Sequence, residues 1–160
     1  MSRGEDQKRV VLSVLDRLLD DEPGHSSEAP LDDSLLLRHT QQAIRRDLQD
    51  LLNSRIRCVP WNPEWKELPD SLLNYGLPDF TAAGMDAASN PDKVLESIRQ
   101  TIERWEPRLS GVRIRQTTDN SYFNRVIKFR IEATMMINEK KHVLFYESVL
   151  EATTGQFDVK

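Results

Sequence analysis

The clearest pattern of apolar and polar positions lies between residues 90 and 111, where it predicts a helix with a marked start. Asn90 suits the N-cap, because its side chain can accept hydrogen bonds from free backbone N–H groups of the first turn. Pro91 suits the first helical position, and Asp92 places negative charge near the positive end of the helix dipole. The apolar stripe of this helix consists of Val94, Leu95, Ile98, Ile102 and Trp105.

The end of this helix is predicted at Glu106-Pro107, because a proline ring crowds the preceding residue and removes a backbone donor. The carboxylate of Glu106 then lies at the negative end of the helix dipole, which is unfavourable unless a cation offsets it. Arg108 is the nearest cation, and its guanidinium can hold a carboxylate with two hydrogen bonds. Two interpretations are open here. The two residues form an internal or solvated pair, or they form a docking site for a partner.

Two further helices are predicted before this one, over residues 6–20 and from Asp33-Ser34 to about Ser54. The apolar stripe of the first helix consists of Val11, Leu15 and Leu18. That of the second helix consists of Leu37, Ile44, Leu48, Leu51 and Leu52. Residues 23–33 are rich in acidic residues, Pro, Gly and Ser, which is typical of a flexible linker. We therefore expect residues 1–22 to form a helical arm that docks on a partner or folds back, and residues 34–160 to form a single domain.

The stretch from Val59 to Asn90 shows no helical or strand periodicity, and its four prolines exclude a long helix or a central strand. We expect a structured loop with one helical turn at Ser71–Asn74. Trp61 and Trp65 are expected to fill gaps in the core rather than to face a partner.

Alternating apolar and polar positions predict an antiparallel sheet in the last third of the chain. The predicted strands are residues 112–115, 126–138, 142–152 and 157–159, with turns at Asp119-Asn120 and at residues 138–141. The inward positions of the longest strand are Ile127, Phe129, Ile131, Ala133, Met135 and Ile137. Helices followed by an antiparallel sheet indicate an α+β fold with the helices packed on one face. Its edge strands would be open to pairing with another chain.

Charge is distributed unevenly along the chain. The formal net charge is −4, so nothing draws the whole protein to nucleic acid or to an anionic membrane. Residues 1–36 carry nine Asp and Glu against four Lys and Arg, whereas residues 99–130 carry three against eight. Such asymmetry indicates a partner surface or a solvated strand face. Cys58 is the only cysteine, and the first ten residues contain no apolar signal segment, so we expect a cytoplasmic protein.

Motifs of the common enzyme classes are absent from the sequence. It contains no Gly-rich phosphate loop, no G-x-S-x-G and no H-E-x-x-H, and its three histidines have no metal-ligand spacing. We expect no metal and no cofactor. A glycosidase pair of carboxylates is harder to exclude, but Arg108 beside Glu106 favours the charged form of the carboxylate, which is wrong for a general acid.

Four stretches together resemble one family of proteins. They are SVLDRLLDDEP at 13–23, IRRDLQDLLNSR at 44–55, SLLNYGLPDF at 71–80 and ERWEPRL at 103–109. In this order they are similar to the TssE family of type VI secretion baseplate proteins, which resembles the wedge proteins of contractile phage tails and is sometimes labelled lysozyme-like. The resemblance covers nearly the whole chain.

The resemblance implies a structural subunit rather than an enzyme. It implies partners among the wedge proteins TssF, TssG and TssK, in the cytoplasmic baseplate at the inner face of the cell envelope. It assigns partner contact to the Glu-Pro-Arg motif, here Glu106, Pro107 and Arg108. It also implies that the sheet templates the first ring of the TssB–TssC sheath. The alternatives are a cytoplasmic anti-adaptor, as in distant members of the wider family, and a peptidoglycan hydrolase.

Overall fold

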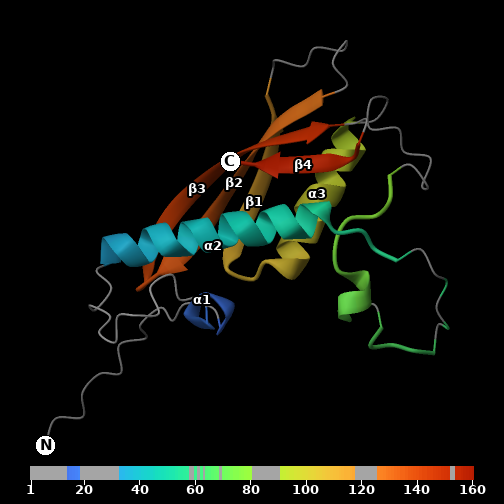
Figure 1. The fold of residues 1–160 in the computed structure, drawn as a ribbon, viewed down its shortest axis with the longest axis horizontal. Coiled ribbons are helices and arrows are strands. Elements are labelled where there is room, and N and C mark those ends of the chain that lie inside the picture. Colours follow the sequence, from blue (N-terminus) through green and yellow to red (C-terminus); the bar gives the residue numbers. More distant parts are fainter. Residues whose placement is uncertain are drawn as a thin grey trace, which may run out of the picture.

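A computed structural model describes residues 14–18, 33–57, 60, 62, 64–68, 70–80, 91–117, 126–151 and 154–160. It has two long helices, α2 (Asp33–Asn53) and α3 (Pro91–Trp105), and a four-stranded antiparallel sheet. The helices cover one face of the sheet and leave the other face open (Figure 1). The predicted α+β fold is therefore confirmed.

Helix α2 runs across the sheet and ends at Asn53, within one residue of the predicted end. Its buried residues are Leu36, Thr40, Ala43, Ile44, Leu48, Leu51 and Leu52. The predicted stripe is thus correct except at its start, where Leu36 is buried and Leu37 packs only partly against the core. The reason is helical phase, because position 36 lies four and eight residues before the buried positions 40 and 44.

Helix α3 begins at Pro91 and ends at Trp105, as predicted; its expected cap, Asn90, lies outside the described residues. Its buried face contains the predicted Val94, Leu95, Ile98 and Ile102, together with Thr101. The loop before it contains the short 3-10 helix η1 (Leu72–Asn74), where one helical turn was expected. Trp105 meets this loop through an edge-to-face contact with Tyr75, at 5.4 Å between ring centroids.

The expectation that Trp65 fills a gap in the core is wrong, because Trp65 is 58% exposed. The core beneath the loop is closed instead by Leu77 and Phe80, which are buried. Trp61 and the predicted turn at Asp119-Asn120 lie outside the described residues.

The sheet has the order β1-β2-β3-β4, with every neighbouring pair antiparallel. The strands are β1 (Leu109–Gln116), β2 (Val126–Ile137), β3 (Lys140–Glu151) and β4 (Gln156–Val159). All six predicted inward positions of β2 are buried, which confirms its alternation. Two inward aromatic rings, Phe129 of β2 and Phe157 of β4, make an edge-to-face contact at 6.2 Å between centroids.

Two strands begin earlier than predicted, for different reasons. Strand β1 starts at Leu109 rather than at residue 112, because a register shift between Ser110 and Arg113 accommodates Gly111 with φ +62°. Strand β3 starts at Lys140 rather than at residue 142. The hairpin turn needs only Asn138 and Glu139, which both have positive φ, as in the two-residue turns that match strand twist.

Helix α1 (Val14–Leu18) is the described part of the expected N-terminal arm. Val14, Leu15 and Leu18 are all more than half exposed, so the apolar stripe predicted there does not join the core. The rest of the predicted helix over residues 6–20 and nearly all of the predicted linker lie outside the described residues.

Candidate functional site

The end of α3 forms a tight corner that leads directly into β1. The last helical hydrogen bond runs from the N–H of Glu106 to the carbonyl of Ile102, at 2.9 Å. The N–H of Leu109 then donates to the carbonyl of Glu106 at 3.1 Å, so the chain reverses over Pro107. This reversal brings the side chain of Arg108 back against Glu106.

Arg108 holds the carboxylate of Glu106 with two side-chain hydrogen bonds. Its Nε donates to Oε1 at 2.7 Å and its Nη2 donates to Oε2 at 2.5 Å. The backbone N–H of Arg108 also donates to Oε1, at 3.2 Å. The cation that the helix dipole requires is therefore Arg108, and the internal pair that the sequence allowed does form.

A second carboxylate, from the middle of α2, binds the same guanidinium. Arg108 Nη2 donates to Asp47 Oδ2 at 2.5 Å, and Asp47 Oδ1 accepts from Arg46 Nη2 at 3.1 Å. We call Asp47, Glu106 and Arg108 the charged corner. It joins α2 to the junction of α3 and β1, so its geometry depends on all three elements.

The members of the charged corner differ in exposure. Glu106 is 4% exposed, whereas the side chains of Arg108 and Asp47 are 30% and 29% exposed. Pro107 lies on the surface. Pro107, Arg108 and Asp47 are therefore accessible to a partner, whereas Glu106 is buried beneath them and orients the guanidinium of Arg108.

The electrostatics of the charged corner extend to two tyrosines. The hydrogen bond to Glu106 raises the pKa of Arg108, against the opposing effect of burial, and Asp47 adds to the rise. Burial raises the pKa of Tyr146 to about 12; the Glu106 carboxylate adds to this and Arg108 opposes it. Burial also raises the pKa of Tyr75, with Asp47 contributing. At neutral pH the corner therefore keeps a charged arginine and two protonated phenols around it.

The sequence pointed to Glu106, Pro107 and Arg108 as a candidate site but did not point to Asp47, which binds the same guanidinium. On α2, Asp47 lies among charged residues that look like an ordinary solvated helix face. Its partner is 61 positions away in the chain, and no local spacing indicates that contact.

A second candidate site is the edge of β3. Strand β4 pairs with Ser148–Glu151 of β3, and Lys160 exchanges two backbone hydrogen bonds with Glu147, at 2.8 and 3.1 Å. Before Glu147, no described residue pairs with β3 on that side, so the edge over residues 141–145 is open. Beside it the outer sheet face carries three exposed apolar side chains, namely Met136, Val143 and Phe145.

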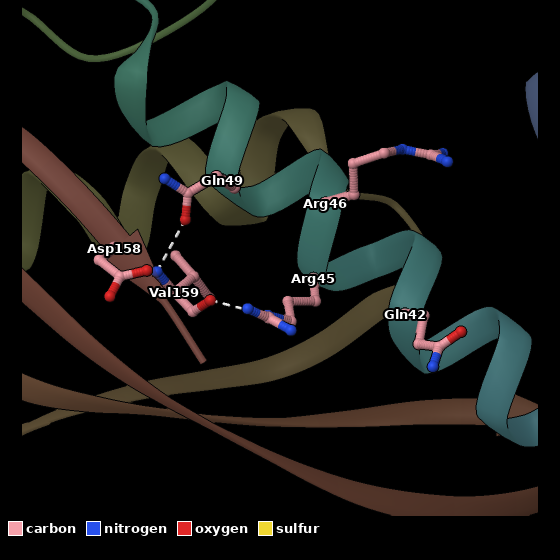
Figure 2. Close-up of a pocket in the computed structure, with 6 residues that line it drawn as sticks. All are labelled: Gln42, Arg45, Arg46, Gln49, Asp158 and Val159. Atoms are coloured by element: carbon pink, nitrogen blue, oxygen red, sulfur yellow. Dashed lines mark hydrogen bonds between the residues drawn. The ribbon is translucent and has the colours of Figure 1, made fainter.

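The outer edge of β4, in contrast, is closed by side chains of α2. Val159 donates its N–H to Gln49 Oε1 at 2.7 Å, and its carbonyl accepts from Arg45 Nε at 2.7 Å (Figure 2). The backbone of Phe157 is held in the same way. Its N–H donates to Asn53 Oδ1 at 2.9 Å, and its carbonyl accepts from Asn53 Nδ2 at 2.9 Å and from Gln49 Nε2 at 2.5 Å. Helix α2 thus replaces the neighbouring strand that β4 lacks.

The exposed basic side chains Arg113, Arg115, Lys128 and Arg130 of β1 and β2 are interleaved with acidic side chains. Arg130 pairs with Glu147 at 2.5 Å, and Arg115 lies 3.5 Å from Glu132. Over the described part of the chain, no group of three or more His, Cys, Asp or Glu side chains could hold a metal ion. Within the same ranges, no helix is long and apolar enough to cross a membrane.

The sequence of this chain was compared with those of known protein families. Residues 38–140, more than half of the chain, match the family of the baseplate wedge protein gp25. The chain belongs to the gp25 baseplate wedge family. A solved structure of the baseplate complex from the type VI secretion system contains a similar chain at 18% sequence identity. The alignment covers 69% of this chain and 93% of that chain, with a TM-score of 0.43. No curated protein matches the sequence.

The wedge family match contains the whole charged corner, from Asp47 to Arg108. It ends at Lys140, the first residue of β3, so the open edge of β3 and its support by β4 lie beyond it. Membership in a family of structural baseplate proteins favours a role without catalysis.

Proposed function

We propose that this protein is a wedge subunit of a type VI secretion baseplate. It docks on the wedge core through the charged corner and templates the contractile sheath through the open edge of its sheet. Its partners on this proposal are TssF, TssG and TssK at the corner and the TssB–TssC sheath at the edge. It works in the cytoplasm, at the inner face of the cell envelope. The observation that carries the proposal is the charged corner within the wedge family match.

The docking step uses the exposed part of the charged corner. Arg108 is fixed by two carboxylates and still exposes 30% of its side chain, so it is a rigid donor for a partner carboxylate or carbonyl. Because the side chain is already ordered, binding costs less conformational entropy than it would for a free arginine. Glu106 takes part by positioning Arg108 and has no partner contact of its own.

The templating step uses backbone pairing along β3. An extended partner strand can bond to the unpaired N–H and C=O groups of Lys141, Val143 and Phe145, which supply affinity without a specific sequence. The apolar side chains of Val143 and Phe145 then gain contacts on the outer face, where they are 60% and 59% exposed. A sheath strand added here would continue the sheet.

The test of the docking step is co-purification of tagged protein with TssF, TssG and TssK. The variant is Glu106→Gln/Arg108→Gln, which removes both charges without leaving a buried carboxylate unpaired. The control is Arg99→Gln/Glu103→Gln, which removes a salt bridge of 2.6 Å from the surface of α3. We expect the complex to survive in wild type and control and to be lost in the corner variant, with circular dichroism unchanged in all three.

The templating step is tested by measuring whether the protein captures the TssB–TssC pair. The variant is Val143→Pro, which removes one backbone N–H from the open edge; proline is tolerated in an edge strand. The matched control is Thr134→Val, a change on the partner strand β2 directly opposite Val143. Capture by wild type and control but not by Val143→Pro supports strand addition. Equal capture by all three contradicts it.

A further inference from the structure

Helix α1 presents an apolar face that the domain does not cover. Val14, Leu15 and Leu18 are each more than half exposed. Their positions i, i+1 and i+4 place the three side chains on one side of the helix. We call these three side chains the α1 face. A helix as short as the described α1 is not stable in water by itself, so its apolar face needs a surface to pack against.

The open face of the sheet carries a second uncovered apolar surface, at the end of the β2–β3 hairpin. Met136, Val143 and Phe145 are each half or more exposed. Met136 lies opposite Lys141 in the register, and strand alternation places Lys141, Val143 and Phe145 on the same face. We call Met136, Val143 and Phe145 the hairpin patch. The helices lie on the other face of the sheet, so α2 and α3 leave this patch uncovered (Figure 1).

The chain that joins the two surfaces enters α2 at the tip of this hairpin. Asp33, the first residue of α2, accepts a hydrogen bond from Asn138 Nδ2 at 3.1 Å. The far end of the hairpin patch is Phe145, whose register partner Glu132 lies six residues along β2 from Asn138, about 20 Å at strand rise. Residues 19–32, between α1 and α2, reach at most about 50 Å, and a flexible coil of that length spans about 20 Å on average. The hairpin patch is therefore at the distance that this tether favours.

The charges of the tether and of the hairpin are complementary. Residues 19–32 contain no Lys or Arg, and their acids are Asp20, Asp21, Glu22, Glu28 and Asp32. Lys140 and Lys141, at the start of β3, are exposed and form no salt bridge with any described residue. An acidic tether that passes the hairpin tip on its way to the open face meets these two cations.

We propose that α1 folds back across the hairpin tip and packs the α1 face onto the hairpin patch of its own chain. Lys140 and Lys141 attract the acidic tether and so direct α1 to the open face of the sheet. The arm is then an internal cover for an apolar surface of the sheet. This inference goes beyond the proposed function and does not depend on it.

The size of the hairpin patch favours a tethered occupant over a separate protein. A stable interface between two proteins buries about 800 Å² on each side and uses 20 or more residues. Three side chains are too few for that. A segment on a short tether, in contrast, experiences an effective concentration in the millimolar range when the tether matches the distance, so a weak contact is enough. At micromolar protein the arm of the same chain therefore prevails over that of a second copy.

The docked arm has a consequence for templating, and this consequence alone rests on the proposed function. A partner strand beside β3 would contact Val143 and Phe145, which α1 covers. The arm and the partner strand thus compete. Loss of arm docking should tighten capture of the TssB–TssC pair by about two- to threefold, because the fraction of chains with an open patch rises.

The decisive measurement is nuclear Overhauser contacts in the full-length, methyl-labelled protein at micromolar concentration. We expect contacts from the methyl groups of Leu15 and Leu18 to those of Met136 and Val143. In Leu15→Ser/Leu18→Ser these contacts vanish and the methyl signals of Met136 and Val143 shift. Leu72→Ser is the matched control, since Leu72 is an exposed leucine of η1 outside both surfaces, and it should leave those signals in place.

Two further samples test the tether and the identity of the occupant. Lys140→Glu/Lys141→Glu should lower the docking equilibrium constant about threefold, and Lys66→Glu/Lys93→Glu, which changes the charge equally at exposed sites elsewhere, should not. An equal response of these two variants overturns the guiding role of the lysines. A mixture of labelled and unlabelled chains shows whether the contacts join two copies.

Contacts between different chains, or no contacts and no shifts at all, overturn the proposal. Failure of every variant to capture the TssB–TssC pair would count against the templating function only, because the contacts within the chain are measured without that pair.

Discussion

Arg108 donates a hydrogen bond from Nη2 to Oδ2 of Asp47 at 2.5 Å, although the two residues are 61 positions apart in the chain. The contact fixes the end of α3 against the middle of α2. Because the same guanidinium also holds Glu106, which is almost completely buried, one side chain both neutralises a buried charge and sets the position of two helices. Changes at the charged corner should therefore affect stability as well as the docking proposed above.

The first prediction concerns the effect on stability. Arg108→Gln leaves the buried carboxylate of Glu106 without its cation, and we expect a loss of about 3 kcal/mol in the free energy of unfolding. Glu106→Gln/Arg108→Gln removes both charges and should cost about 1 kcal/mol, because no buried charge remains. Urea unfolding of Glu106→Gln, Arg108→Gln and the double variant measures the coupling energy. Additive effects of the single variants would contradict the coupling.

The second prediction concerns high pH. The pKa of Tyr146 is raised to about 12 in the folded protein, from an ordinary value of about 10. A raised folded pKa gives stability that is complete below pH 10 and is lost as the pH rises through 12. We expect the free energy of unfolding to fall by roughly 2–3 kcal/mol across this range because of Tyr146.

The control for this prediction is Tyr146→Phe. It loses the hydroxyl hydrogen bond to Gln41, which should cost about 1 kcal/mol at every pH. It should also show a shallower decline between pH 10 and pH 12 in urea unfolding followed by circular dichroism. Parallel curves for the two proteins would show that Tyr146 does not cause the decline. Tyr75, whose pKa is also raised, contributes equally to both.

Much of the fold could be predicted because it depends on local patterns. The stop at Pro107, the start at Pro91 and the alternation of β2 all follow from backbone sterics and periodicity. Trp65 could not be placed in this way. An isolated tryptophan in a proline-rich loop belongs to no periodic pattern, so its burial could not be predicted from spacing. Among the described residues of this loop, the buried apolar side chains are Leu77 and Phe80.

In the candidate sites too, contacts between neighbours in the sequence could be predicted and contacts between distant residues could not. The pairing of Glu106 with Arg108 could be inferred because only Pro107 separates them. Asp47 required knowledge of how α2 crosses the α3–β1 junction. The closure of β4 by α2 joins Gln49 to Val159, 110 positions later, and glutamine on a helix surface gives no indication of such a role.

The third prediction compares two glycines with positive φ. A Cβ at Gly76, where φ is +111°, would lie 2.5 Å from the carbonyl oxygen of Ser54. A Cβ at Gly111, where φ is +62°, meets nothing within 4 Å. We expect Gly76→Ala to lose about 3 kcal/mol or more, from strain plus the clash, and Gly111→Ala about 1 kcal/mol, from the left-handed conformation alone. Thermal unfolding of the two variants measures the difference.

A similar loss in both variants would mean that the chain around Gly76 yields to the new methyl group. That would be surprising, because Ser54 and Leu77 are held together on either side of it. The N–H of Leu77 donates to the carbonyl of Ser54 at 2.9 Å, and the N–H of Ile56 donates back to Leu77 at 2.9 Å. Moving Ser54 away from a methyl group would break this pairing.

The last prediction concerns the closed edge of β4. Gln49→Ala leaves the buried N–H of Val159 without its acceptor, which should cost about 2 kcal/mol in the free energy of unfolding. It also exposes a strand edge, so we expect association that grows with protein concentration. Gln42→Ala, a matched change two helical turns away at a side chain that forms no bond to β4 in the described ranges, should alter neither property. Urea unfolding and light scattering measure the two effects. If Gln49→Ala stays as stable and as monomeric as Gln42→Ala, β4 is held by its pairing with β3 and its inward side chains alone, and the closure of its edge by α2 contributes nothing.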